Sequence, residues 1–193
     1  VFDLSYLRMI PNMIVAAPKD EAELRDLLYT AINYEEGPFA VRYPRSGVVG
    51  VQVSGKPKKI KIGSWKVINK GSRVAILATG TGVQIALKAM EKTGRKKPTL
   101  VNARFVKPMD TGFMKKLARD HKVFITVEEN ALEGGFGSAV ASWLADNDVP
   151  VVCERIGLPD RFIRHGSQDK LLSECKVSAG EVARAIKRMW RVR

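Results

Sequence analysis

The sequence predicts an α/β fold: a three-layer sandwich with a mostly parallel sheet, preceded by part of a second α/β unit. Short apolar runs alternate with segments in which apolar residues recur at helical spacing, along most of the 193 residues. Such alternation is typical of parallel sheets covered by helices. The charge also changes along the chain. Residues 1–54 carry net charge −2, whereas the remainder carries +15, which indicates two units.

The first unit is predicted to be a strand–helix–strand motif. Residues 13–17 form an apolar run closed by Pro18. Asp20 is placed to cap the following helix, with Glu23 three residues later, and apolar residues repeat at helical spacing as far as Tyr34. A second strand over residues 39–43 follows the Gly37–Pro38 turn.

Residues 51–62 are predicted to link the two units, because residues 46–62 hold Gly47, Gly50, Gly55, Pro57 and a cluster of four lysines. The apolar–polar alternation at residues 60–62 and again at 65–67 indicates a small hairpin or an edge element. The domains are therefore expected at residues 1–50 and 63–193.

The second unit is predicted to alternate strands and helices throughout. Strands are expected at residues 74–78, 99–103, 123–127 and 149–153, and helices after residues 82, 110 and 137. Ser178 and Glu181 form a capping box that begins a last helix through Met189.

Arg45 is the strongest candidate for binding a ligand. It stands just past the end of the predicted strand 39–43, and open α/β sheets bind ligands beyond the carboxyl ends of their strands. The guanidinium group grips phosphate or carboxylate with two parallel hydrogen bonds. A metabolite phosphate, a carboxylate and a structural ion pair are all compatible with this position.

Two glycine-rich segments precede predicted helices. Residues 79–82 (TGTG) lack the third glycine of a dinucleotide-binding loop and the lysine of a P-loop, so a tight turn is expected. Residues 134–138 (GGFGS), with residues 128–130 just upstream, could form a polar site at strand ends, but helix–sheet packing and a subunit contact through Phe136 are expected instead. Strand alternation places Glu128 and Glu129 on opposite faces of the preceding strand, one of them half-buried.

The remaining chemistry-bearing residues carry no catalytic pattern. His121 is expected at a solvated helix end and His165 in a loop crowded with cations, and neither has a serine or cysteine partner at a recognisable spacing. Cys153 and Cys175 do not form a metal or redox spacing, which is typical of a reducing, cytosolic compartment. No apolar run approaches the ~20 residues that span a bilayer.

Several phrases occur in the order of one known family. They are FDLSYLR (residues 2–8), VRYPR (41–45), ARFVKPMD (103–110), VEEN (127–130) with GGFGS (134–138), and GLPDRF (157–162). Together they resemble the C-terminal part of the 1-deoxy-D-xylulose-5-phosphate synthases, a branch of the transketolase-like enzymes that depend on thiamine diphosphate. The resemblance covers essentially the whole chain. It implies part of a pyrimidine-binding domain, followed by a transketolase C-terminal domain.

The resemblance also implies an activity, partners and a role for Arg45. The family condenses pyruvate with glyceraldehyde 3-phosphate, with decarboxylation, for isoprenoid, thiamine and pyridoxal synthesis. Arg45 matches the arginine that helps to hold the phosphate of the aldehyde. A homodimer located in the cytoplasm, or in the plastid stroma of a plant or alga, is implied, with the rest of the same polypeptide as a further partner.

The family's cofactor motifs are not found among these residues. The Gly-Asp-Gly motif for diphosphate and magnesium and the glutamate that activates the pyrimidine belong to earlier parts of the family's sequence. The sequence also begins with Val1 and not with Met, and no leader segment precedes it, so we expect Val1 to be an internal point of a longer polypeptide. The chain alone is expected to bind neither thiamine diphosphate nor Mg²⁺ and to be inactive, with no catalytic, cofactor-binding or metal-ligating residue assigned to it.

Two alternatives remain from other classes. The +15 region could serve a basic module that binds nucleic acid or an acidic partner, although aromatic interleaving is poor and no nucleic-acid-binding signature is present, so specific binding is not expected. The β subunit of a 2-oxo acid dehydrogenase shares the architecture but is disfavoured by residues 157–162.

Overall fold

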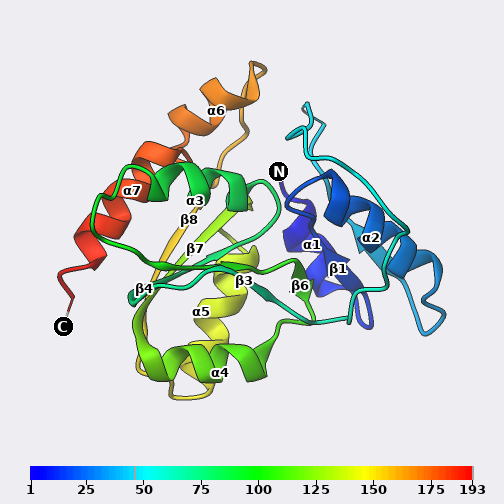
Figure 1. Ribbon diagram of the computed structural model, residues 1–193, viewed down its shortest axis with the longest axis horizontal. Helices are drawn as coiled ribbons and strands as arrows, with labels where there is room; N and C mark the ends of the chain where they lie inside the picture. The colour runs from blue at the N-terminus through cyan, green and yellow to red at the C-terminus, as the bar shows by residue number, and fades with distance from the viewer. Residues whose placement is uncertain (46, 193) are drawn as a thin grey trace.

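The computed structural model describes residues 1–45 and 47–192; Ser46 and Arg193 lie outside the described residues. The described chain forms a five-stranded sheet covered by helices on both faces and, beside it, a three-stranded sheet (Figure 1). The predicted three-layer α/β fold is confirmed.

The larger sheet has the strand order β3-β5-β4-β7-β8. These strands span Lys66–Asn69 (β3), Thr99–Asn102 (β5), Arg73–Ala78 (β4), His121–Ala131 (β7) and Val152–Leu158 (β8). β5, β4, β7 and β8 are parallel, and β3 pairs with β5 in the antiparallel sense, so the sheet is mostly parallel as predicted.

Helices cover the two faces of this sheet. α3 (Gly82–Met90) and α7 (Ala179–Met189) lie on one face, and α4 (Thr111–Asp120) and α5 (Phe136–Asp146) lie on the other (Figure 1). Successive side chains of β4 point to opposite faces of the sheet, as expected for a strand. Val74, Ile76 and Ala78 pack with α3 and α7, whereas Ala75 and Leu77 pack with α4 and α5. Because both faces are buried, the strand reads as a continuous apolar run.

The smaller sheet has the order β2-β1-β6. The predicted strand–helix–strand motif is present as β1 (Ile14–Ala16), α2 (Glu21–Ile32) and β2 (Phe39–Val41), with the two strands parallel. Asp20 caps α2 by accepting the backbone N–H of Glu23 at 2.9 Å. β6 (Phe105–Lys107) comes from the second part of the chain and pairs antiparallel with β1. The two parts of the chain therefore share a sheet.

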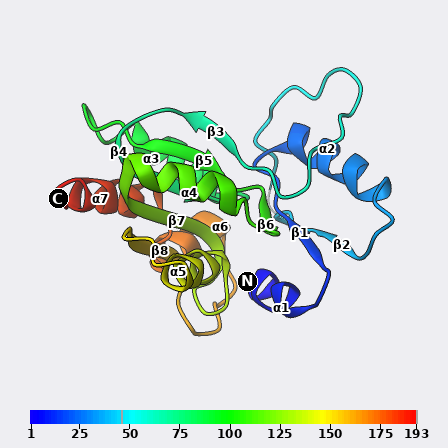
Figure 2. The ribbon, with the colours of Figure 1, turned by 90° about the horizontal axis from the view of Figure 1, so that it is seen from below.

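α1 (Asp3–Met9) fixes the beginning of the chain to the far end of β7 (Figure 2). The backbone N–H of Leu4 donates to Asn130 Oδ1 at 3.1 Å, and the Arg8 guanidinium donates to the carbonyl of Gly135 at 2.8 Å. The buried Leu4 side chain joins the same hydrophobic cluster as Phe136 of α5. This helix therefore belongs to the interface between the two sheets.

The linker lies along α2 and is held by its side chains. Arg25 donates to the carbonyl of Ser54 at 2.8 Å, and Thr30 Oγ1 accepts the backbone N–H of Ile60 at 2.9 Å. Residues 60–62, all within the described part of the chain, form no strand, so the prediction of a hairpin arm there is wrong. The second arm is the edge strand β3.

One predicted strand begins later than expected, and three short elements were not predicted. The strand expected at residues 149–153 begins at Val152 instead, because Asp148 adopts a left-handed conformation (φ 52°) and Pro150 lacks the N–H that a ladder needs. α1 and α6 (Gln168–Glu174) have seven residues each, too few for a clear helical period. β6 is a three-residue strand whose partner lies about 90 residues away.

Candidate functional site

The candidate site lies where the carboxyl ends of strands from both sheets meet. From β4 the chain continues to β5 on one side, and β7 lies on the other, so the ends of β4 and β7 flank the point at which the strand order reverses. Ligands of open α/β sheets bind at such a point. Thr81 follows β4 there, and Glu129 belongs to the last part of β7.

Arg45 lies at a cavity of about 450 Å³ at this junction. This volume is within the range of small-molecule pockets. The Arg45 side chain is exposed, and it shares the cavity with two other polar side chains, Glu129 and Gln168. The other lining residues are mostly apolar: Val1, Leu158, Ile163, Gly166, Leu171 and Leu172. The cavity therefore combines one cationic side chain, one carboxylate and one amide with a largely apolar wall.

Glu129 receives hydrogen bonds from two residues that follow strands of the larger sheet. Its Oε2 accepts the hydroxyl of Thr81 at 2.5 Å, and its Oε1 accepts the side-chain amide of Gln168 at 2.7 Å. An Arg42 nitrogen lies 3.9 Å from Oε2, so the negative charge also has a cationic neighbour. These contacts fix the start of α6 against the end of β7.

Arg42 connects β2 to the other side of the junction. Its Nε donates to Asp3 Oδ2 at 2.9 Å, and a terminal nitrogen donates to the backbone carbonyl of Glu129 at 2.9 Å. Burial alone would raise the pKa of Asp3, but the charge and hydrogen bond of Arg42 hold it below its ordinary value. Arg42 therefore anchors the segment that carries Arg45.

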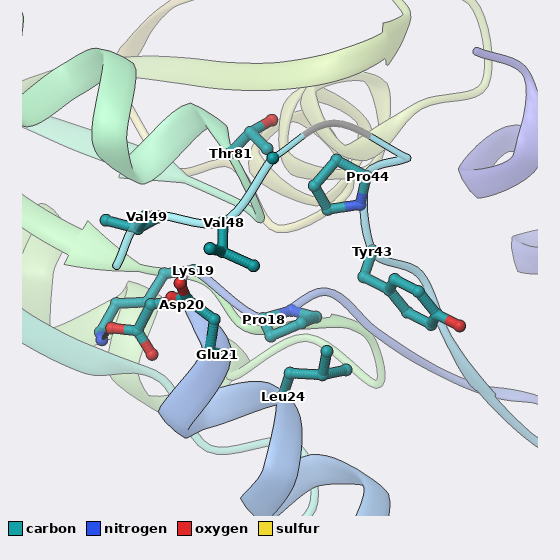
Figure 3. A pocket seen from close by; sticks show the side chains of 11 residues that line it. Pro18, Lys19, Asp20, Glu21, Leu24, Tyr43, Pro44, Val48, Val49 and Thr81 are labelled. Carbon is teal, nitrogen blue, oxygen red and sulfur yellow. Dashed lines mark hydrogen bonds and ion pairs between the residues drawn. The ribbon is translucent and has the colours of Figure 1, made fainter. Parts of the chain in front are cut away.

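A second cavity, of about 310 Å³, lies beside that segment, and Figure 3 shows the side chains that line it. Tyr43 and Pro44 line it, whereas Arg45 lines the larger cavity. Lys19 pairs with Asp20 there, and Glu21 Oε1 accepts the backbone N–H of Gly50 at 2.6 Å, whereas Glu21 Oε2 is buried with no hydrogen-bond partner found among the described residues. The remaining walls are largely apolar, including Pro18, Leu24 and Val48.

Glu128 points to the opposite face of β7, as strand alternation predicts, and it is fully buried. Its two oxygens accept the backbone N–H groups of Phe136 and Gly137, each at 2.7 Å, at the beginning of α5. Burial raises the pKa of this carboxyl to about 7, although these two hydrogen bonds and Arg8 act in the other direction. Glu128 thus ties α5 to the sheet and lies away from the Arg45 cavity.

The glycine-rich segments serve packing. A Cβ atom on Gly82 would overlap the carbonyl of Val127, which explains why a glycine stands where the tight turn leads into α3. Phe136 is buried and stacks edge-on with Trp65, with ring centroids 5.7 Å apart. The expectation that Phe136 forms a subunit contact is therefore wrong, since the ring belongs to this chain's own core.

The two histidines differ. His121 is buried, so the expectation of a solvated helix end is wrong: α4 ends where β7 begins, and the ring turns inward. Its Nε2 lies 2.8 Å from Thr99 Oγ1 and its Nδ1 lies 3.1 Å from the carbonyl of Leu117. His165 is exposed, as expected for its loop, and neighbours the cavity-lining Gly166.

Gln168 is the cavity residue that the sequence analysis missed. It comes from a seven-residue helix with no motif, and its partner Glu129 lies 39 residues earlier. The signal that could have indicated the pair is the topology, because residues that follow neighbouring parallel strands meet at one edge of the sheet. Within residues 1–45 and 47–192, no cluster of three or more His, Cys, Asp or Glu side chains could hold a metal ion.

The two sheets, with their shared junction, define an α/β protein of the transketolase type. Residues 63–182 match the family described as "Transketolase, C-terminal domain", and residues 1–49 match "Transketolase, pyrimidine binding domain". The chain belongs to the transketolase family. A solved structure described as "Split gene transketolase, inactive beta4 tetramer" is 30% identical, with a TM-score of 0.84, covering 97% of this chain and 60% of that one.

Curated relatives narrow the resemblance within this family. The 1-deoxy-D-xylulose-5-phosphate synthase of Aquifex aeolicus (strain VF5) is 49% identical over 189 residues, which are 97% of this chain and 30% of that enzyme. The synthase of Geobacillus thermodenitrificans (strain NG80-2) is 43% identical over 190 residues, with the same coverage. The resemblance inferred from the sequence is confirmed. The chain spans about 30% of the length of these relatives. In the described part of the chain, no helix is long and apolar enough to span a membrane.

Proposed function

We propose that this chain acts as the C-terminal portion of a 1-deoxy-D-xylulose-5-phosphate synthase. In that enzyme pyruvate is decarboxylated and its two-carbon unit is joined to glyceraldehyde 3-phosphate. We assign residues 1–50 to the end of the pyrimidine-binding domain, residues 51–62 to a linker and residues 63–193 to the C-terminal domain. Identity to named synthases over 97% of the chain supports this assignment.

The observation that carries the proposed role is the position of Arg45. Its exposed guanidinium lies at a cavity of about 450 Å³ beyond the carboxyl end of β2. The carboxylate in the same cavity, Glu129, is engaged by Thr81, Gln168 and Arg42, so its charge is partly compensated. Arg45 is left to bind the phosphate of glyceraldehyde 3-phosphate with two parallel hydrogen bonds.

The acidic residues of this junction do not fit a magnesium–diphosphate group. Asp3 is paired with Arg42, Glu129 is engaged as above, and the buried Glu23 accepts the side-chain amide of Asn102 at 2.8 Å. We therefore derive no step through thiamine diphosphate from these residues. In this proposal the remaining part of the polypeptide, within a homodimer, holds the cofactor and its Mg²⁺.

Kinetics of the complete enzyme with Arg45→Ala test the role of Arg45. A charge-assisted hydrogen-bonded contact contributes about 1.5–3 kcal/mol, so the apparent KM for glyceraldehyde 3-phosphate should rise roughly 10- to 150-fold while that for pyruvate changes little. Arg184→Ala is the matched control, because Arg184 is 66% exposed on α7. Equal increases in both KM values would contradict the proposal.

A further inference from the structure

The pairing of Glu129 with Gln168 leaves part of an amide unused inside the Arg45 cavity. A glutamine side chain offers two N–H donors and a carbonyl acceptor. One N–H of Gln168 donates to Glu129 Oε1 at 2.7 Å, and this is the side-chain hydrogen bond found for Gln168 among the described residues. The second N–H and the carbonyl oxygen remain for a molecule in the cavity that Gln168 lines together with Arg45.

Glu129 is arranged to orient this amide and not to react. Its second oxygen accepts the Thr81 hydroxyl at 2.5 Å, with an Arg42 nitrogen 3.9 Å away. The carboxylate is therefore held at once by the N-cap residue of α3, by the residue that follows β2 and by the first residue of α6. A carboxylate fixed in this way selects one orientation of the Gln168 amide, because only the N–H side of that amide can donate to it.

The wall behind Gln168 is fixed by packing. α6 carries Leu171 and Leu172 into the same cavity, and Leu172 is 9% exposed within the core that α3 and α7 form with the sheet. Gln168 therefore stands on an anchored helix, opposite a strand-end segment that Arg42 holds in place. Rigid support of this kind suits a group that selects among ligands.

We propose that Gln168 is a specificity-determining residue that hydrogen-bonds the hydroxyl or carbonyl oxygen of the aldehyde whose phosphate Arg45 holds, and that Glu129 is its positioning residue. The inference rests on the proposed function of Arg45. It assigns recognition of the polar carbon chain to the C-terminal domain and recognition of the phosphate to the pyrimidine-domain segment. A hydroxyaldehyde phosphate would then bind more tightly than phosphate alone.

The test compares two probes on the full chain by NMR titration: inorganic phosphate and glyceraldehyde 3-phosphate. Gln168→Leu should weaken binding of glyceraldehyde 3-phosphate roughly 2- to 12-fold, as expected for one neutral hydrogen bond, and leave inorganic phosphate unchanged. Glu129→Leu should weaken binding of glyceraldehyde 3-phosphate relative to inorganic phosphate by a similar factor. Glu129→Gln, which removes the same charge, should restore much of that preference, since an amide carbonyl still accepts from Gln168. Gln52→Leu, at an exposed linker position, is the control.

The outcomes separate the two proposals. If Arg45→Ala abolishes binding of both probes while Gln168→Leu changes neither, the role of Gln168 is overturned and that of Arg45 stands. If the unaltered chain binds neither probe, both fall. Equal weakening of both probes in Gln168→Leu, with a folded spectrum, would also overturn the inference, because it would indicate a merely structural role for the amide.

Discussion

The fully buried Glu128 carboxylate on β7 accepts the backbone N–H of Gly137 at 2.7 Å. The other oxygen of Glu128 accepts the backbone N–H of Phe136, so one buried side chain satisfies two of the free N–H groups at the beginning of α5. The positive end of the helix dipole favours the ionised form, whereas burial opposes it. Burial prevails, and the pKa of Glu128 lies at about 7.

The raised pKa predicts that Glu128 makes the protein less stable as pH rises. Its ordinary pKa is 4.5, so between pH 4.5 and 7 the folded protein binds more protons at this site than the unfolded chain. A shift of this size corresponds to about 3 kcal/mol of unfolding free energy, present below pH 4.5 and lost by pH 7. The stability difference between the wild type and Glu128→Gln, measured by urea unfolding at several pH values, should change across that window. A difference that stays flat from pH 4 to 8 would show that Glu128 titrates normally.

Substitution of Gly137 tests how tightly α5 packs on this carboxylate. Alanine normally stabilises a helix relative to glycine, but a Cβ on Gly137 would overlap Thr126 Oγ1 and approach Glu128 Oε1. Gly137→Ala should therefore lower the free energy of unfolding by about 1–3 kcal/mol. Gly112→Ala in α4 is the matched control, since its Cβ would meet nothing within 4 Å, and it should be neutral or stabilising. Chemical denaturation measures both, and similar effects would contradict the packing argument.

The regular elements could be predicted because their signals are local. The four residues from Asp20 to Glu23 are enough to predict a helix cap, and the apolar run at residues 74–78 predicts a strand buried on both faces. β6 could not be predicted in this way, because three residues carry no period and their pairing with β1 is set by the meeting of two distant segments. His121 was misjudged for a related reason: the parallel pairing of β7 with β4, and not the local polarity, decides that the ring is buried.

One residue of the candidate site, Arg45, could be predicted from the sequence, whereas the hydrogen-bond network around Glu129 could not. Arg45 follows a recognisable strand, so the strand-end rule placed it at the cavity. Glu129 carries the same signal, but its partners come from three separate elements, and only the assembled topology brings Thr81, Arg42 and Gln168 to it. A hydrogen-bond network of this kind has no periodicity in the sequence.

Arg42 and Arg45 should respond differently to the same substitution. Arg42 and Arg45 are three positions apart, yet the Arg42 side chain is 13% exposed and bonded to Asp3 and Glu129, whereas Arg45 is exposed at the cavity. Arg42→Met leaves the Asp3 carboxylate and the Glu129 carbonyl without their donor, so the free energy of unfolding should fall by about 1–3 kcal/mol. The pKa of Asp3, followed by NMR, should rise, because the charge and hydrogen bond that lower it are gone.

Arg45→Met is the matched variant, with the same change of charge and shape. It should leave the unfolding free energy within about 0.5 kcal/mol of the wild type, since Arg45 is exposed and no hydrogen bond or ion pair of its side chain is found among the described residues. Arg45→Met should instead weaken phosphate binding directly. Arg42→Met should change phosphate binding only by displacing the segment that carries Arg45. If urea denaturation shows equal losses for both variants, Arg45 has a structural partner and its availability for phosphate is refuted; if Arg42→Met is neutral, Arg42 does not anchor the segment that carries Arg45.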